Sequence, residues 1–91
     1  MASDATWKPY SAQGELSTRE RDELPASVYA FPKQRKEPLT DAAHVRNALA
    51  RFDQVEGVSD ADRELAFANI EKAAKHFDVE MTAHSWRELM S

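Results

Sequence analysis

The chain has 91 residues, no cysteine, and 16 acidic against 12 basic residues, which gives a formal net charge of −4. The length indicates one small domain, the lack of cysteine excludes disulfides, thiolate zinc sites and cysteine nucleophiles, and the acidic balance gives no general attraction to nucleic acid. The start of the chain shows no secretory-signal pattern, and no apolar run approaches the roughly 20 residues of a membrane span. We therefore expect a cytoplasmic protein with no membrane partner.

Residues 1–14 contain one proline, one glycine and two aromatic residues without helical or strand periodicity. We interpret them as a flexible N-terminal arm, and residues 15–91 as a single helical domain. Trp7 and Tyr10 either fold back onto the domain or contact a partner. Folding back is the commoner outcome for aromatic residues in a polar arm.

A short helix is predicted within LSTRERDELP, where Ser17 is the candidate N-cap and Pro25 stops the helix. The following ASVYAFP favours an extended conformation, because the residue before Pro32 is restricted to non-helical angles. Between Pro32 and Pro38 we expect a turn-rich connection, with strand pairing of a residue or two at most.

The next two segments carry the clearest helical periodicity. Apolar residues recur at three- and four-residue spacing from 41 to 54, with Thr40 as the N-cap and Asp41 in the first turn. The segment SDADRELAFANIEKAAKHF repeats the pattern, with Ser59 as N-cap and Asp62 as its capping-box partner. These patterns predict two long amphipathic helices, and the alanines on their apolar stripes permit close approach.

A last short helix is predicted in AHSWRELM, with Thr82 as the candidate cap and Trp86 docked onto the body. The predicted fold class is therefore all-α: a small helical domain of two long amphipathic helices, a short helix at each end, and an extended proline-containing segment laid across them. The sequence does not fix the oligomeric state, and self-association through the alanine stripe or the aromatic arm remains an alternative.

The stretch YAFPKQRKEPLTDAAHVRNALARF, continued by KAAKHFDVE and SWREL, is similar to a family of small uncharacterised proteins common in actinobacteria. The resemblance covers residues 16–91. A shorter version, built around DAAHVRNALAR and a later AAK helix, resembles a module of some phage-associated proteins. The family has no assigned activity, so the resemblance implies no catalytic or binding residues, and the phage association suggests only a role in assemblies or near nucleic acid.

The sequence offers few candidates for catalysis or metal binding. His44, His76 and His84 are possible metal ligands, and Asp41 lies one turn before His44, but no second ligand pair stands at a recognisable spacing. No serine lies in a strand–turn–helix elbow, no glycine-rich phosphate loop is present, and the carboxylates are spread along helix surfaces. We therefore expect a non-enzymatic protein with no metal and no other cofactor.

Positive charge is densest in the turn before the first long helix, where two rigidifying prolines and a helix N-terminus coincide with it. The predicted binding surface comprises Lys33, Arg35, Lys36, His44, Arg46 and Asn47. We expect this surface to contact a protein partner whose identity the sequence does not give. The structural alternative is that Arg35 and Lys36 pair with acidic neighbours and stay solvated.

A weak nucleic-acid-associated protein that uses the same basic surface is the alternative function. Two helices joined by EGVS resemble a helix-turn-helix, and Arg51 extends the possible basic face. The second helix begins with SDADRE, however, and its acidic side chains would repel phosphates. A protein partner is therefore the first interpretation, and steep salt dependence of binding would instead indicate nucleic acid.

Overall fold

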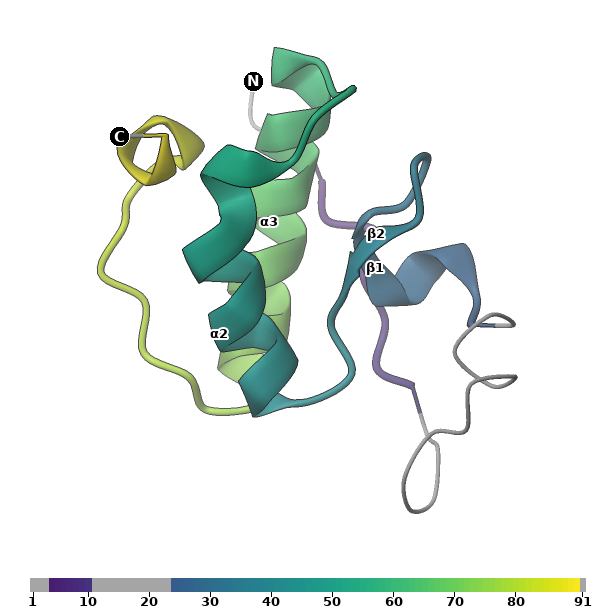
Figure 1. The fold of residues 1–91 in the computed structure, drawn as a ribbon. Coiled ribbons are helices and arrows are strands. Elements are labelled where there is room, and N and C mark those ends of the chain that lie inside the picture. The colour runs from purple at the N-terminus through teal and green to yellow at the C-terminus, as the bar shows by residue number, and fades with distance from the viewer. Residues whose placement is uncertain (1–3, 11–23, 91) are drawn as a thin grey trace.

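A computed structural model describes residues 4–10 and 24–90 (Figure 1). The elements, in which η denotes a 3-10 helix, are η1 (Ala26–Val28), β1 (Tyr29–Phe31), β2 (Lys36–Pro38), α2 (Ala42–Arg51), η2 (Phe52–Gln54), α3 (Asp60–His76) and η3 (Trp86–Leu89). In this part of the chain no helix is long and apolar enough to cross a membrane. The helix predicted from Ser17 and the predicted boundary between residues 14 and 15 lie outside the described residues.

The prediction of an all-α fold is wrong, because the proline-containing segment pairs with itself. β1 and β2 form an antiparallel two-stranded sheet in which Tyr29 lies opposite Pro38 and Phe31 lies opposite Lys36. Pro32 follows β1 and Pro38 ends β2, so both prolines stand at strand ends, where a missing N–H is tolerated. The segment is therefore a β-hairpin beside the helices and not a linear strap across them.

Side-chain caps fix where the two α-helices begin. Asp41, and not Thr40, is the N-cap of α2, and its Oδ1 accepts a hydrogen bond of 2.8 Å from the His44 N–H. The capping box predicted at the start of α3 is confirmed: Ser59 Oγ accepts from the Asp62 N–H over 3.1 Å, and Asp62 Oδ2 accepts from the Ser59 N–H over 3.0 Å.

Helical structure is shorter than predicted at two places. The helix predicted from 41 to 54 stops being α-helical at Arg51, and its last three residues form the 3-10 helix η2. The last predicted helix is only the single 3-10 turn of η3, which starts after Ser85 and not at Thr82. Helix ends commonly tighten to 3-10 geometry, which gives the last carbonyl groups partners.

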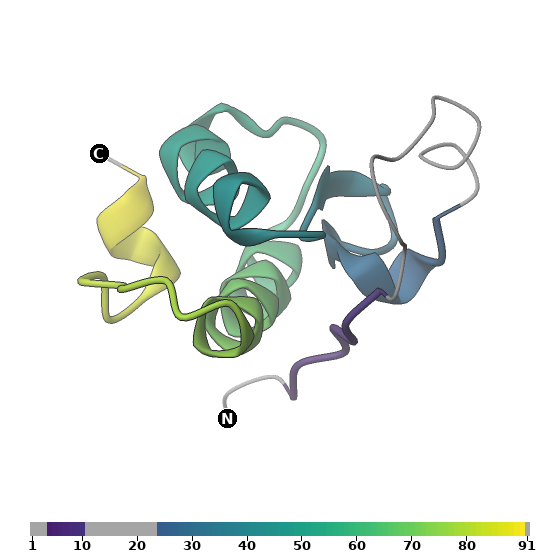
Figure 2. The same cartoon turned by 90° about the horizontal axis from the view of Figure 1, so that it is seen from below.

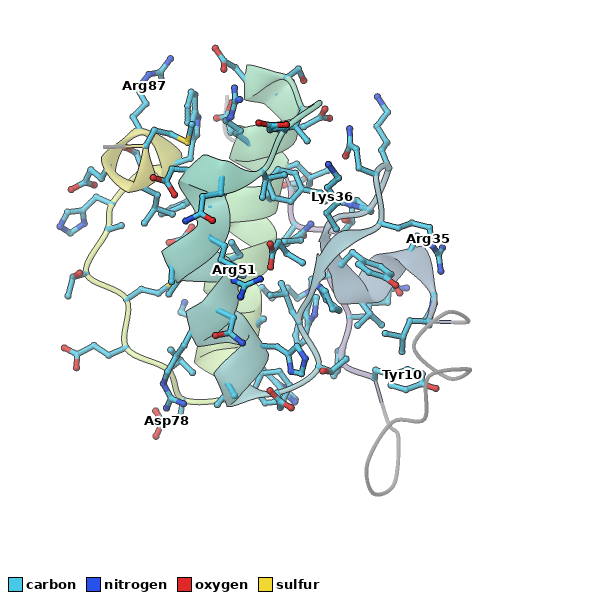
Figure 3. All side chains as sticks on the ribbon, viewed as in Figure 1. Tyr10, Arg35, Lys36, Arg51, Asp78 and Arg87 are labelled. Atoms are coloured by element: carbon cyan, nitrogen blue, oxygen red, sulfur yellow. The ribbon has the colours of Figure 1, made fainter. Side chains whose placement is uncertain are left out.

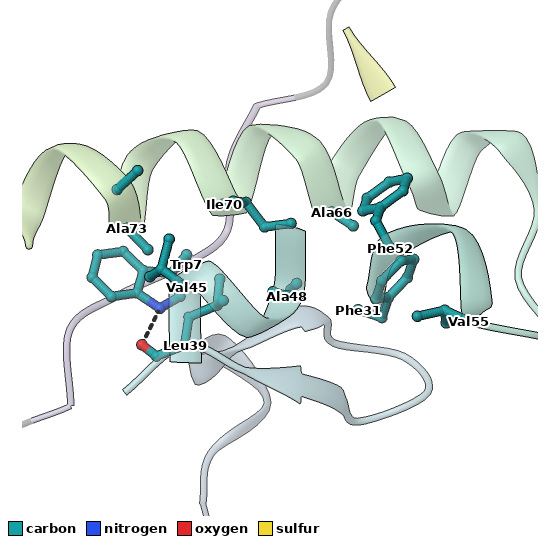
Figure 4. Close-up of a cluster of buried hydrophobic side chains, with 12 residues drawn as sticks. Trp7, Phe31, Leu39, Val45, Ala48, Phe52, Val55, Ala66, Ile70 and Ala73 are labelled. Carbon is teal, nitrogen blue, oxygen red and sulfur yellow. Dashed lines mark hydrogen bonds between the residues drawn. The ribbon is translucent and has the colours of Figure 1, made fainter. Parts of the chain in front are cut away.

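The hydrophobic core lies between α2, α3 and the hairpin (Figures 2 and 4). α3 packs on β1, while α2 packs on both α3 and β2. The rings of Phe31 and Phe52, with centroids 5.7 Å apart, join the hairpin to the end of α2. Ala66 and Ala73 are fully buried on α3, and their small side chains let neighbouring elements approach closely.

The two ends of the described chain pack onto this core. After α3, residues 77–90 run back along the helices, and η3 packs near the start of α3, where the Arg63 guanidinium lies 5.9 Å from the Trp86 ring centroid. At the other end Trp7 is 1% exposed and belongs to the core cluster. Trp7 thus folds back onto the domain, as the commoner of the two sequence alternatives predicts.

Candidate functional site

The basic turn, which we define as Lys33, Arg35 and Lys36, spans the loop of the β1–β2 hairpin and the first residue of β2. Gln34, which lies between Lys33 and Arg35, attaches the loop to α3, since Gln34 Nε2 donates a hydrogen bond of 2.9 Å to Asp62 Oδ2. The pKa of Asp62 is lowered, first by the backbone hydrogen bond from Ser59 and further by Gln34 and the charge of Lys33. The hairpin loop is therefore positioned by the capping box of α3.

Arg35 lies at the outer edge of the hairpin, away from α2 (Figure 3). Its Nη2 donates to the carbonyl of Leu24, and its guanidinium carbon lies 5.2 Å from the centroid of the Tyr29 ring. Its backbone φ of 53° is in the left-handed region, which non-glycine residues adopt only when surrounding contacts hold them there. Arg35 thus has internal partners and holds the hairpin against the segment that precedes β1.

The two lysines of the basic turn are exposed and differ in their contacts. Lys36 Nζ donates a hydrogen bond of 2.8 Å to the carbonyl of Glu56, in the connection between η2 and α3. The Lys33 side chain has no hydrogen bond or ion pair with the residues that the structure describes, although its charge acts on Asp62. Because the Lys36 ammonium has three donors, it keeps donors for a ligand while it contacts Glu56.

His44 is tied to the start of α2. Its Nδ1 lies 2.8 Å from Asp41 Oδ1 and 3.3 Å from Thr40 Oγ1. Burial acts to raise the pKa of Asp41, but the hydrogen bonds from His44 and the charge of its ring outweigh burial and lower that pKa. The Asp41–His44 pair is therefore primarily a capping arrangement at the helix N-terminus.

The remaining predicted residues, Arg46 and Asn47, are exposed on α2, and neither side chain has a hydrogen bond or ion pair within the described ranges. At about 100° per residue, Arg46 lies about 200° around the helix from His44. Asn47 follows His44 by three residues and precedes Arg51 by four, so these three side chains share one flank. The structure therefore does not bring the six predicted residues onto one continuous surface.

An open pocket of about 390 Å³ lies between β2 and the end of α2. It is lined by Lys36, Glu37, Pro38, Arg51, Gln54 and Val55, and we name it the β2–α2 pocket. Val55 is buried and Pro38 is half-buried, so together they give the pocket an apolar part. The exposed side chains of Lys36, Arg51 and Gln54 give it a polar part that carries two positive charges.

Glu37 is the acidic residue of this pocket. Burial raises its pKa, and the charges of Arg51 and His44 offset that rise only in part. Its φ of 58° is also in the left-handed region. The exposed Arg51 side chain has no hydrogen bond or ion pair in the described part of the chain, so the pocket combines a desolvated carboxyl group with an available guanidinium.

The sequence does not indicate Glu37 or Gln54 as binding residues, and it indicates Arg51 only for the nucleic-acid alternative. The sequence does contain a pattern that places Arg51 beside His44, because the two residues are seven positions apart and seven residues make about two helical turns. Glu37 and Gln54 carry no such signal, since they approach Arg51 only through the hairpin and through the 3-10 turn that ends α2.

The other two histidines lie apart from this pocket. The His76 ring, at the end of α3, contacts Trp7 and Phe77 with centroid distances of 5.5 Å and 4.8 Å. His84 precedes η3, and its N–H donates to Glu88 Oε2. Across residues 4–10 and 24–90, no group of three histidine, aspartate or glutamate side chains is placed to hold a metal ion.

Comparison with known protein families places the chain. Residues 13–84 match the model of the family of unknown function DUF6582, and the protein belongs to that family. The match covers the hairpin, both α-helices and the β2–α2 pocket. Neither the curated proteins nor the solved structures contain a significant match to this chain.

Proposed function

We propose that the protein is a small non-enzymatic module that binds a protein partner through the basic turn and the adjoining α2, with the β2–α2 pocket at the centre of the contact. The observation that carries this proposal is Arg51, which borders the pocket with an exposed guanidinium that no described residue pairs. Arginine is enriched in protein interfaces, where its planar donor group recognises carboxylates.

The composition of the pocket favours an acidic segment of the partner. The Arg51 guanidinium offers two parallel N–H donors to a carboxylate, and Lys36 adds a second positive charge. Pro38 and Val55 offer apolar contact to the aliphatic part of the same segment. Glu37 lies in the same pocket, where burial raises the pKa of its carboxyl group and the charge of Arg51 opposes that rise.

The proposed surface keeps part of the set predicted from sequence. Lys36 lines the pocket, His44 and Asn47 share the helix flank of Arg51, and Lys33 lies at the nearby hairpin loop. Arg35 is left out because Leu24 and Tyr29 already pair with it. Arg46 is left out because it lies on another side of α2.

Weak association with nucleic acid remains the second candidate function, and the geometry supports it less. Phosphate contact needs several cations along one face, because each contact adds a similar increment to affinity. Arg35 lies at the outer edge of the hairpin (Figure 3), and Arg46 lies about 200° around α2 from His44. Asp62, at the start of α3, interacts with the charge of Lys33. The cations available to a nucleic acid are therefore few and lie next to an acidic helix start.

The proposal is tested by capture experiments with matched charge reversals. One variant combines Lys36→Glu with Arg51→Glu at the pocket, and the control combines Arg46→Glu with Lys72→Glu, which reverses the same charge at exposed positions elsewhere. Partners from nuclease-treated cell extract are captured on each tagged protein and quantified by mass spectrometry. We expect the pocket variant to lose its partner about tenfold or more, which corresponds to about 1.4 kcal/mol or more, while the control retains it.

Retention of the partner by the pocket variant would contradict the proposed site. A partner that is captured from untreated extract but not from the nuclease-treated extract would favour the nucleic-acid alternative. Circular dichroism of both variants distinguishes loss of binding from loss of folding. Both variants are expected to fold, because all four substituted side chains are exposed.

A further inference from the structure

The N-terminal segment, residues 4–10, binds the domain as an extended peptide would. The N–H groups of Thr6 and Trp7 both donate to Asn69 Oδ1, over 2.7 Å and 2.9 Å, and the Lys8 N–H donates to the Ser27 carbonyl over 2.9 Å. None of these bonds belongs to a sheet, because the sheet in the described residues consists of β1 and β2 and does not include residues 4–10. The segment is held by individual groups that recognise its backbone.

The side chain of Trp7 provides the specific contact. It is 1% exposed, and its Nε1 donates a hydrogen bond of 3.1 Å to the Leu39 carbonyl (Figure 4). The rings of His76 and Phe77 meet it edge-on, with centroid distances of 5.5 Å and 5.8 Å. A buried indole with a satisfied N–H is the anchor type that dominates many peptide and protein contacts.

Asn69 joins this segment to the rest of the domain. It is fully buried in the middle of α3, where an unpaired amide would be costly. Its Oδ1 faces the N-terminal segment, and its Nδ2 donates to the Ala30 carbonyl of β1 over 2.9 Å. Both ends of the Asn69 side-chain amide are therefore hydrogen-bonded, which explains how a polar residue is tolerated at a buried position inside the helix.

The groups that receive the segment all come from the part of the chain after residue 24. We name them the Trp7 groove, which consists of Ser27, Leu39, Asn69, His76 and Phe77. Backbone hydrogen bonds supply affinity and a side-chain pocket supplies specificity, which is the usual division in peptide recognition. The groove and its ligand are therefore separable parts of one chain, joined through residues 11–23.

We infer that the Trp7 groove is a peptide-recognition site that also accepts residues 4–10 of a second copy of this chain, which gives an exchanged dimer. In such a dimer each groove keeps the same hydrogen bonds and the same buried indole, so exchange of an identical segment costs few contacts. In the monomer the tethered segment has an effective concentration of about millimolar, so intramolecular binding dominates in dilute solution. Exchange becomes favourable when a chain cannot fill its own groove.

The test combines two full-length variants with complementary defects. Trp7→Ala leaves the groove intact and removes its ligand, while Asn69→Ala leaves the ligand intact and damages the groove. The isotope-labelled Trp7→Ala chain is mixed with the unlabelled Asn69→Ala chain at concentrations up to about 1 mM. Native mass spectrometry and sedimentation velocity detect a heterodimer, and NMR of the labelled chain reports the Asn69 side-chain amide.

A second measurement supplies the ligand alone. The synthetic peptide DATWKPY, the sequence of residues 4–10, is added to the Trp7→Ala protein, and DATAKPY serves as the control peptide. We expect the first peptide to shift the Asn69 amide signals and to raise the unfolding temperature, and the control peptide to bind at least about tenfold more weakly. If Trp7→Ala does not fold alone, Trp7→Phe retains most of the buried ring and is titrated in the same way.

The expected result is a heterodimer in the mixed sample, absent from either variant alone, together with binding of DATWKPY. Binding of the peptide without any heterodimer would overturn exchange between copies. No binding of the peptide and no heterodimer would overturn the groove as a recognition site. Both failures leave the β2–α2 pocket untouched, because it shares no residue with the Trp7 groove.

Discussion

The backbone N–H of Trp7 donates a hydrogen bond of 2.9 Å to Oδ1 of Asn69, although 62 positions separate the two residues in sequence. This bond connects the first described segment of the chain to the centre of α3. The same amide also holds the Ala30 carbonyl of β1. A single buried side chain thus organises the N-terminal segment, the hairpin and the longest helix.

Replacement of Asn69 by alanine is expected to lower the free energy of unfolding by about 3 kcal/mol or more. The substitution leaves two backbone N–H groups and one carbonyl without their partner, and each unsatisfied buried group costs about 1–3 kcal/mol unless water reaches it. Urea denaturation measures the loss. Glu71→Ala, at an exposed position of the same helix, is the control and is expected to change stability by about 0.5 kcal/mol or less. Equal stability of the two variants would show that Asn69 is not an organising contact.

Removal of the capping box at α3 is expected to destabilise the protein in a pH-dependent way. The folded-state pKa of Asp62 is lowered, so its carboxylate contributes stability above the ordinary aspartate pKa and loses that contribution as pH falls through the lower folded-state pKa. Asp62→Asn is therefore expected to be less stable than the wild type at pH 7, with the difference closing in acid. Denaturant unfolding from pH 7 to pH 2 tests this, and Ser59→Ala should cost about 1 kcal/mol. A difference that stays constant with pH would contradict this assignment.

The opposite pH dependence is expected for Glu37. Its pKa is raised by burial, so protonated Glu37 favours the folded state, and this contribution is lost as pH rises above the ordinary glutamate pKa. Glu37→Gln should therefore be more stable than the wild type at pH 7 and equal to it near pH 4. Thermal unfolding at both values measures the effect. A variant that is less stable at pH 7 would indicate that the attraction of Glu37 to Arg51 exceeds the cost of its burial.

Arg35 is expected to contribute to stability more than to partner binding. Arg35→Ala removes a hydrogen bond to the Leu24 carbonyl and the contact with the Tyr29 ring, at a cost of about 1 kcal/mol for a partly exposed site. Arg35→Lys keeps the charge but loses the planar donor group, so it should restore little of this stability. Chemical denaturation gives the stability, and partner capture should stay within about twofold of wild type. Strong loss of the partner with unchanged stability would return Arg35 to the binding surface.

Much of the helical part of the fold follows from local signals. The capping box at Ser59 and Asp62 and the apolar stripes of both long helices are readable because they act over one or two turns. The hairpin is not readable in the same way. Its strands are only three residues long, and its loop is held by Gln34 and Arg35 through partners elsewhere in the chain. Tertiary contacts of this kind override the local preference that predicted an all-α domain.

The candidate site is only partly predictable for the same reason. A basic cluster before a helix is visible in the sequence, but its members diverge in space: Arg35 turns to Tyr29, whereas Lys36 turns to the connection after η2. The pocket itself depends on Glu37, which reaches the flank of Arg51 only because the hairpin packs on α2. Sequence spacing along one helix predicts the flank shared by His44 and Arg51 but not the strand that faces it.

The central proposal is that the β2–α2 pocket binds an acidic protein segment. Its most direct test is an amide-resolved NMR titration of the labelled protein with an acidic peptide that carries aliphatic residues, and separately with a mixed-sequence DNA duplex, each at low and physiological salt. We predict that the peptide shifts the amide signals of Lys36, Glu37 and residues 51–55, that these shifts are lost in Lys36→Glu/Arg51→Glu, and that the duplex leaves them unchanged at physiological salt. Shifts with the duplex but not with the peptide, or peptide shifts that persist in the charge-reversed variant, would contradict the proposal.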